Sequence, residues 1–242
     1  MPAALSSTLA NFIADMNIQW TPYQECVAAT TSRGRYSEMP DASPMINPNG
    51  YIGRYQLSAD TLTSLGLLNS AVQTKEGIQT SSNWVQIADT TGSVQGEVLA
   101  PFFSNAPIFS VPDTPQFVSG NSDAFLLDYA LQDKCFIAST YMNFLQLKSY
   151  GVITGKETTA DRAGWLNVTE FVGFGSPGSL LSFAVGMVLS NSVVQQITNV
   201  SGAVGLFVYW KILGNNPANF GSPDPTGKTP YDYFLQGSQT QS

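Results

Sequence analysis

The longest regular pattern of the chain lies between Ser122 and Tyr150, and it has the period of an α-helix. Apolar residues recur there at intervals of three, four or seven, which places them on one helical face. Asn121 or Ser122 precedes the pattern as an N-cap, and Gly151 follows it as a stop. The face consists of Leu126, Ala130, Ile137, Tyr141 and Phe144. This segment therefore favours a mostly α fold.

Shorter helical patterns occur before and after this segment. Thr21 is expected to cap the second of them, with Pro22 at the first helical position. Ser58 is expected to cap the third, which carries Leu62 and Leu65 inward and stops at Gly66. The predicted ranges are 5–16, 21–32, 59–65, 158–172, 179–190 and 192–213.

Two regions lack such a pattern. Residues 70–121 are predicted to form an irregular insertion, because prolines interrupt its phenylalanine-rich part. We expect this insertion to form an arm that lies either against a neighbouring subunit or around its own domain. Within it, residues 84–87 are expected to form a short strand or a helix fragment. Residues 214–242 are predicted to be a C-terminal loop segment, rich in Gly, Pro and Asn. We expect a single domain over residues 1–242.

The chain carries few charges. Charged residues make up 11% of the sequence, whereas an ordinary globular domain has about 25%. This shortfall favours a surface covered by partner subunits in a multi-copy assembly, although a surface rich in Ser, Thr, Asn and Gln is the alternative. The net charge of −7 argues against nucleic-acid binding. It also disfavours a freely diffusing cell-wall hydrolase, since the wall is polyanionic.

The reactive residue types are limited to carboxylates and two thiols. Histidine is absent, which excludes Ser-His-Asp and Cys-His catalysis and disfavours zinc sites. We therefore expect no metal and no cofactor. Cys26 and Cys135 are interpreted as buried reduced thiols of a protein made in the cytoplasm, and the sequence leaves a bridge between them open.

No membrane span is predicted. The N-terminus lacks the basic and apolar regions of a signal peptide. Residues 171–210 contain no formal charge, but polar residues interrupt the stretch well before about 20 apolar residues accumulate. We interpret it as two buried helices.

Two segments near the N-terminus carry the most specific motif. Residues 28–37 read Ala-Ala-Thr-Thr-Ser-Arg-Gly-Arg-Tyr-Ser, and residues 49–56 read Asn-Gly-Tyr-Ile-Gly-Arg-Tyr-Gln. Together they resemble the active-site half of the phage tail-associated lysozyme and lytic-transglycosylase superfamily. In that family a helix ends in Glu-Ser-Gly-Gly-x-Tyr, and a turn then delivers Gly-Tyr-x-Gly-x-Tyr-Gln along the sugar cleft. The resemblance implies a lysozyme-like helical domain.

The same resemblance implies which residues contact a sugar. The family's glutamic acid protonates the leaving oxygen of a peptidoglycan glycosidic bond, which requires a raised pKa. Thr31 stands at that position, and a hydroxyl cannot serve as a general acid near neutral pH. The substrate-binding positions implied by the match are Thr31, Tyr36, Tyr51, Gly53, Tyr55 and Gln56, with no catalytic residue among them.

Weaker similarity extends over the second half of the chain. Asp161-Arg162-Ala163-Gly164-Trp165-Leu166 resembles the family's Ala-Gly-Leu-Leu helix. The residues Asp224, Gly227, Lys228, Thr229 and Tyr231 resemble its closing segment.

The departures from the family decide the expected function. Arg33 replaces a glycine beside Thr31, and the connection from Glu38 to Gly50 is longer than usual. Glu25, Glu38 or a neighbouring chain could still supply the missing carboxyl. Glu170 is expected to be a buried, hydrogen-bonded carboxylate rather than a catalytic one.

These observations favour a structural protein of a phage virion, in the tail, baseplate or hub. It would be assembled in the host cytoplasm with other tail and baseplate subunits and would contact peptidoglycan glycan at most. The alternative is an active tail-associated muramidase or lytic transglycosylase that cleaves peptidoglycan during DNA entry. A third option is a glycan-binding module without turnover.

Overall fold

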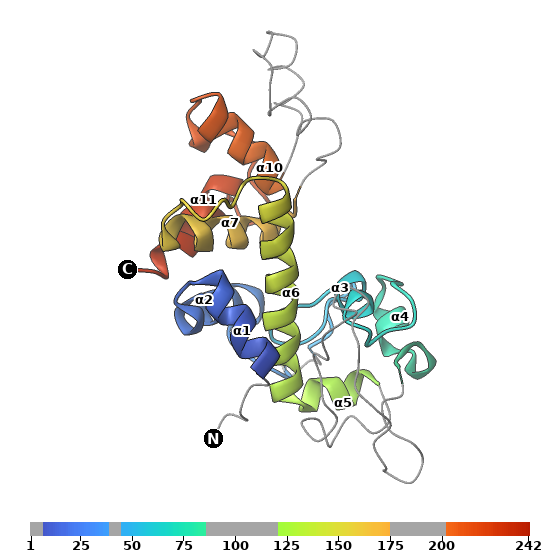
Figure 1. The fold of residues 1–242 in the computed structure, drawn as a ribbon. Helices are drawn as coiled ribbons and strands as arrows, with labels where there is room; N and C mark the ends of the chain where they lie inside the picture. The colour runs from blue at the N-terminus through green and yellow to red at the C-terminus, as the bar shows by residue number, and fades with distance from the viewer. Residues whose placement is uncertain (1–6, 39–44, 86–120, 175–201) are drawn as a thin grey trace. The chain divides into compact units, whose positions relative to one another are not determined.

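The structure is a computed structural model that describes residues 7–38, 45–85, 121–174 and 202–242 (Figure 1). Helices dominate these residues, which confirms the mostly α class. Within the described ranges the extended pairing consists of three isolated β-bridges, Ile46–Ile52, Ile52–Leu57 and Leu68–Trp84. Three predictions fall outside these ranges: the arm over residues 86–120, the helix over 179–190, and residues 192–201 of the helix after it.

The chain divides into two compact units. Unit 1 comprises residues 1–16 and 27–142, and unit 2 comprises residues 17–26 and 143–242. Helices α2 (Trp20–Ser32) and α6 (Tyr129–Ser149) each contribute residues to both. The expected single domain stays a prediction, because lobes of one domain would divide in the same way.

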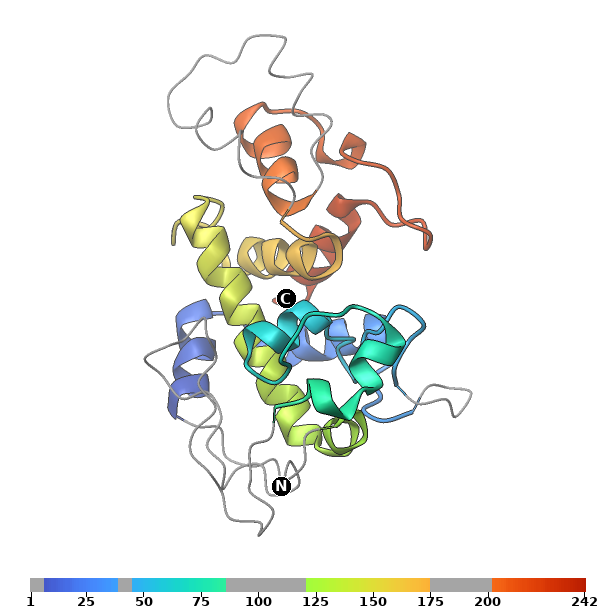
Figure 2. The same ribbon diagram turned by 90° about the vertical axis from the view of Figure 1, so that its right-hand side faces the viewer.

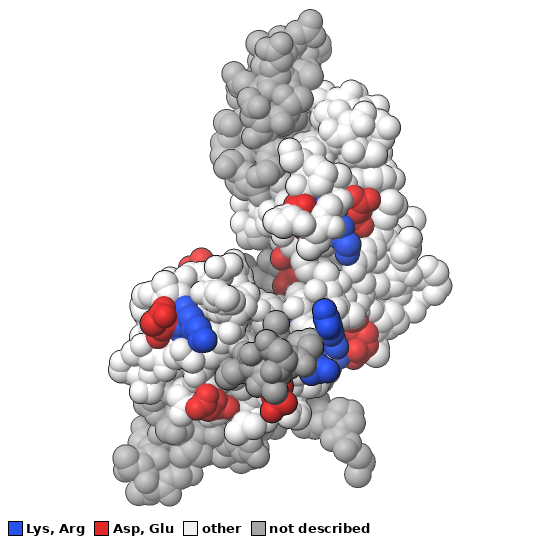
Figure 3. Space-filling model, turned by 180° about the vertical axis from the view of Figure 1, so that it is seen from behind, with Lys and Arg blue, Asp and Glu red and all other residues white. Residues whose placement is uncertain are grey.

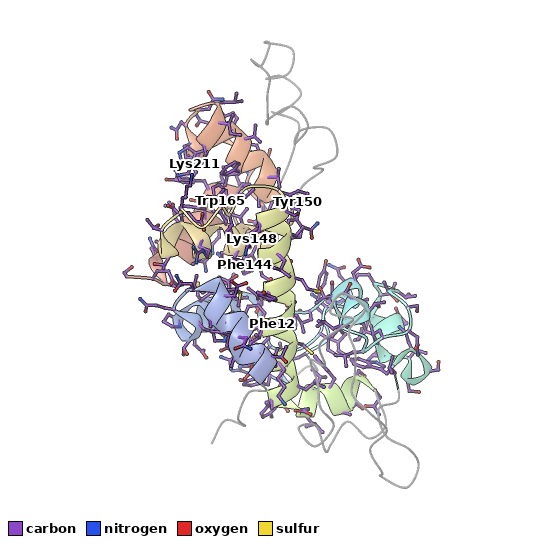
Figure 4. The ribbon with its side chains drawn as sticks, in the orientation of Figure 1. Phe12, Phe144, Lys148, Tyr150, Trp165 and Lys211 are labelled. Carbon is purple, nitrogen blue, oxygen red and sulfur yellow. The ribbon has the colours of Figure 1, made fainter. Side chains whose placement is uncertain are left out.

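Helix α1 (Ser7–Met16) confirms the first predicted helix over its described residues. Its apolar stripe is buried: Leu9 and Met16 are 0% exposed. The ring of Phe12, labelled in Figure 4, stacks on Tyr141 at a centroid distance of 4.1 Å. The Tyr141 hydroxyl donates to Asp15 at 2.8 Å. These contacts join α1 to α6 within unit 1.

Helix α2 begins earlier than predicted. It starts at Trp20, so Thr21 and Pro22 lie inside its first turn and Thr21 is not the N-cap. The first amides of a helix have no intrahelical acceptor, so a proline in this turn removes no backbone hydrogen bond. The predicted end is confirmed, since Arg33 and Gly34 follow Ser32 with φ of 57° and 78°.

Side-chain caps confirm the third helix. Ser58 accepts from the Thr61 amide at 3.1 Å and begins α3 (Ala59–Ser64), which stops before Gly66 with φ of 76°. The segment predicted to be irregular contains further order up to residue 85. Thr74 caps the short helix α4 (Lys75–Gln79), and a 3₁₀ turn η1 (Ser81–Asn83) follows.

The long helix predicted over 122–150 is interrupted. Asn121 caps α5 (Ser122–Leu127), and α6 begins only at Tyr129. Asp128 separates them with φ of −91° and ψ of 84°, outside the helical region. Its carboxylate accepts from the Leu131 amide at 2.9 Å, which satisfies a free donor in the first turn of α6. Because the backbone of Asp128 is not helical, two helices occupy the range predicted to be one.

Unit 2 is built around the aromatic core of α7 (Thr159–Val172). Thr158 caps this helix, which starts one residue after the predicted start at 158. Trp165, labelled in Figure 4, is 1% exposed and lies against three rings, those of Phe207, Trp210 and Phe234. These rings come from α10 (Gly202–Phe207), the π-helical turn η4 (Val208–Ile212) and α11 (Pro230–Gln239).

The C-terminal segment corrects the predicted loop over 214–242. It contains a short 3₁₀ turn η5 (Pro217–Asn219) and the ten-residue helix α11. Thr229 and Asp232 form a reciprocal capping box at its start, with Pro230 at the first position. α11 lies beside α7 in Figures 1 and 2. A β-carbon on Gly237 would lie 2.5 Å from the Ala163 carbonyl oxygen, so this approach requires glycine.

Both cysteines are free thiols, with Cys135 buried and Cys26 half-buried. Over the described part of the chain, no helix has the length and apolar character needed to cross a membrane.

Candidate functional site

The motif over residues 49–56 forms a tight double turn in unit 1. Ile52 pairs with both Ile46 and Leu57, so the chain folds back on itself twice. Gly50 and Gly53 have φ of 79° and 77°, in the left-handed region. A β-carbon on Gly53 would lie 2.4 Å from the Gln132 side-chain oxygen, and one on Gly50 would lie 2.6 Å from the Thr74 backbone. The two glycines are therefore needed for close approach by other parts of unit 1.

Thr31 joins the end of α2 to this turn. Its hydroxyl donates to the Arg54 carbonyl oxygen at 2.7 Å and lies 3.0 Å from the Val27 carbonyl oxygen. The structure thus brings together the two segments that carry the motif. Thr31 therefore serves as a link between helix and turn.

Gln132 of α6 fixes the turn from a second direction. Its side-chain oxygen accepts from the Arg54 amide at 2.8 Å. Its side-chain nitrogen lies near the Leu126 and Phe125 carbonyl oxygens, at 3.0 and 3.2 Å. The side chain is 0% exposed, so a buried amide connects α5, α6 and the motif turn.

Asp133, the next residue of α6, is at the centre of a polar cluster. Its carboxylate accepts from the Tyr55 hydroxyl at 2.6 Å and from the Tyr36 hydroxyl at 3.1 Å. The Arg54 guanidinium donates to the Tyr36 hydroxyl and lies 4.5 Å from the centroid of that ring. Tyr36 therefore stands between a cation and an anion. Burial and the charge of Asp133 raise the pKa of Tyr36, and the charge of Arg54 opposes that rise.

Aromatic contacts hold the two tyrosines in place. Tyr55 is 1% exposed and stacks on Phe136 with centroids 4.1 Å apart. Tyr36 is half-buried and stacks on Tyr129 at 4.5 Å. We call these residues, namely Tyr36, Arg54, Tyr55, Tyr129 and Asp133, the tyrosine–aspartate cluster.

The six predicted sugar-contacting residues separate into two groups. Thr31, Tyr36, Gly53 and Tyr55 meet around Arg54 and the start of α6. Tyr55 is too deeply buried to stack on a sugar, which corrects the expected role of its ring. Tyr51 lies apart and is 37% exposed. Gln56, with φ of 50°, donates from its side chain to the Gly53 carbonyl oxygen at 2.9 Å, so its amide stabilises its own turn.

The carboxyl groups considered as replacement acids lie in different environments. Glu25 and Glu38 are exposed, whereas a general acid needs an apolar surrounding. Glu170 of α7, in unit 2, is largely buried, and burial raises its pKa to about 7. It accepts from the Asn143 amide at 3.4 Å. In agreement with the sequence, it is a buried carboxyl with a hydrogen bond.

Sequence reasoning missed Arg54, Gln132 and Asp133 as site residues. One signal was available: Gln132, Asp133 and Lys134 are three consecutive polar residues within the apolar pattern of the predicted long helix. Gln132 and Lys134 are 0% and 2% exposed. Buried polar side chains such as these have hydrogen-bond partners inside the protein.

The tyrosine–aspartate cluster combines aromatic rings with one positively and one negatively charged hydrogen-bonding group. A cation and an anion are balanced through Tyr36, and Asp133 offers carboxylate oxygens beside an aromatic ring. No group of three or more metal-ligating side chains occurs among the described residues. A shallow hollow of about 440 Å³ lies elsewhere in unit 1 and is lined by polar residues including Ser70 and Asn83. The side-chain nitrogen of Asn83 donates to the Ser70 and Gly77 carbonyl oxygens, and its side-chain oxygen accepts from the Ser70 hydroxyl. The polar atoms of this hollow therefore largely satisfy one another.

Comparisons with protein-family models, with curated proteins and with solved structures found no match to this chain. The site therefore has to be interpreted from its own geometry.

Proposed function

We propose that the chain is a structural protein of a phage virion, in the tail, baseplate or hub. In this proposal it is built on a lysozyme-like fold that has lost its catalytic acid. Unit 1 contacts the glycan strands of peptidoglycan without cleaving them. The protein is assembled in the host cytoplasm in several copies, together with other tail and baseplate subunits.

The hydrogen bonding of Thr31 is the observation that carries the proposal. The hydroxyl donates to the Arg54 carbonyl oxygen, so it holds the end of α2 against the motif turn. The acid position is occupied by a group that cannot protonate a glycosidic oxygen near neutral pH. The contact between the two motif segments, together with a hydroxyl in place of a carboxyl, supports binding over turnover.

The distribution of charge supports an assembly subunit. Charged residues are 11% of the chain. On the face shown in Figure 3, the described Lys, Arg, Asp and Glu side chains form a few small, separated groups. A free monomer usually carries a denser mixture of both signs on its surface.

Purified peptidoglycan sacculi test the proposal. The full chain should bind to sacculi in a pull-down and release no reducing or anhydro-muropeptides on prolonged incubation. A known muramidase serves as the positive control for release. Muropeptide release that depends on one carboxyl group of this chain would contradict the proposal.

A second candidate function is an active muramidase or lytic transglycosylase, and Glu170 is the observation in its favour. A general acid must carry a proton, and a carboxyl with a pKa of about 7 is protonated in about half of the molecules at neutral pH. Glu170→Gln would then abolish muropeptide release. Glu25→Gln and Glu38→Gln serve as matched controls, since both side chains are exposed and each change removes one charge.

A further inference from the structure

Tyr129 presents an unusually accessible aromatic ring at the edge of the tyrosine–aspartate cluster. Its side chain is 46% exposed, and the preceding Leu127 is 62% exposed. The Tyr129 hydroxyl has no hydrogen-bond partner within the described ranges. The function proposed above assigned this ring no role.

The backbone at this point is fixed although the side chain is exposed. Tyr129 is the first residue of α6, and Asp128 caps that helix through the Leu131 amide at 2.9 Å. The half-buried Tyr36 stacks on the ring with centroids 4.5 Å apart and an interplanar angle of 27°. A ring held this way loses little further freedom when a ligand binds, which favours affinity.

Hydrogen-bonding groups lie next to this ring. Asp133 follows Tyr129 by one helical turn, so both residues lie on the same side of α6. Tyr36 touches both of them, with its ring against Tyr129 and its hydroxyl on Asp133. An aromatic face therefore lies beside a half-buried carboxylate.

We infer that Tyr129 is the stacking surface of a sugar subsite, which takes one pyranose ring of a neutral, N-acetylated glycan with Asp133 accepting from its hydroxyls. This inference rests on the glycan contact proposed above and names the residues that make it. One face of a pyranose ring carries C–H groups, which suit the electron-rich face of a tyrosine. The ring hydroxyls are donors, which suit a carboxylate acceptor.

The charges select a neutral ligand. The net charge of −7 and the carboxylate of Asp133 both repel anions such as phosphate backbones. A cationic peptide would meet the Arg54 guanidinium close to the same ring of Tyr36. A neutral polyhydroxylated ring incurs neither repulsion.

Titration of the full chain with chitotetraose, a neutral N-acetylglucosamine oligomer, tests the inference. Dissociation constants are measured by calorimetry for the wild type, Tyr129→Ala, Tyr129→Phe and Leu127→Ala. We expect Tyr129→Ala to raise the Kd about tenfold or more, since an aromatic stacking partner is lost. Tyr129→Phe keeps the ring and should stay within about threefold of the wild type. Leu127→Ala removes an exposed apolar neighbour without a ring and should leave the Kd unchanged.

The outcomes separate this inference from the proposed function. If the wild type binds chitotetraose and Tyr129→Ala binds equally well, the subsite is overturned and the glycan contact stands. If the wild type binds neither chitotetraose nor sacculi, the glycan contact and the subsite are both wrong. Should Tyr129→Ala unfold, Tyr129→Leu takes its place, since it keeps an apolar side chain without an aromatic ring; a Kd equal to that of the wild type would then overturn the stacking role. A loss for Leu127→Ala equal to that for Tyr129→Ala would contradict it.

Discussion

Asp133 of unit 1 and Glu170 of unit 2 have different surroundings. In unit 1, Asp133 accepts from two tyrosine hydroxyls, and one of these, on Tyr36, also accepts from the Arg54 guanidinium. In unit 2, Glu170 lies among packed helices, and the described residues give it one long hydrogen bond from Asn143. Asp133 is thus stabilised by donors, whereas burial without such donors raises the pKa of Glu170 to about 7.

The two regions also differ in the kind of interaction that stabilises them. Unit 1 holds its motif turn through directional bonds from Thr31, Gln132 and Asp133. The core of unit 2 has apolar surfaces in close contact, with Trp165 at the centre of several rings. Directional bonds fix a geometry for recognition, while apolar burial supplies most of the free energy of folding.

The largest expected effect is the loss of the Trp165 ring in unit 2. Trp165→Ala should lower the free energy of unfolding by about 3 to 5 kcal/mol, because the ring is buried and its removal leaves a cavity. Urea unfolding followed by circular dichroism measures the change. Trp165→Phe is the control and should cost less. A loss below about 1 kcal/mol for the alanine variant would show that the aromatic core is not the main support of unit 2.

The second prediction concerns pH and Glu170. In the unfolded chain this carboxyl has its ordinary pKa of 4.5, and burial raises the pKa to about 7 in the folded chain. Between these values the unfolded chain has lost a proton that the folded chain retains. The contribution of Glu170 to the free energy of unfolding should therefore fall as pH rises from about 4.5 to about 7, by about 2 to 3 kcal/mol.

Glu170→Gln provides the matched control for that pH profile, since it keeps the shape and removes the titration. The difference between the two unfolding curves should widen with pH over this window and then become constant. A difference that does not change with pH would show that Glu170 is well solvated in the folded chain.

The third prediction addresses the donors around Asp133 in unit 1. Asp133→Ala removes the acceptor of two tyrosine hydroxyls and the anion next to Arg54. The half-buried position limits the expected loss in the free energy of unfolding to about 2 kcal/mol. Asp133→Asn retains an acceptor oxygen and should lose less. Equal losses for the two variants would mean that charge, rather than hydrogen bonding, holds the cluster together.

The smallest expected effect is at Thr31. Thr31→Val removes the hydroxyl that donates to the Arg54 carbonyl oxygen and should lower the free energy of unfolding by about 1 kcal/mol. Thr31→Ser keeps the hydroxyl and should stay closer to the wild type. Neither variant should change muropeptide release, because Thr31 is proposed to link two segments and not to transfer a proton.

The sequence by itself determined the mostly α class and the local signals for several helix ends. The caps Ser58 and Asn121 and the stops at Gly34 and Gly66 are visible because cap and stop residues act on their immediate neighbours. These local signals did not predict the break at Asp128, which divides the predicted helix over 122–150 within an otherwise continuous apolar pattern. They also did not predict α11, whose capping box lies in a stretch rich in glycine and proline.

Only the tertiary structure decided which polar residues form the site. Asp133 is far from Tyr36 and Tyr55 in the sequence, and no local pattern indicates that all three meet. It likewise decided that the Tyr55 ring is buried while the Tyr129 ring is exposed, although both are tyrosines near apolar residues. Helix periodicity sets the face on which a residue lies, but burial depends on what the rest of the chain places against that face.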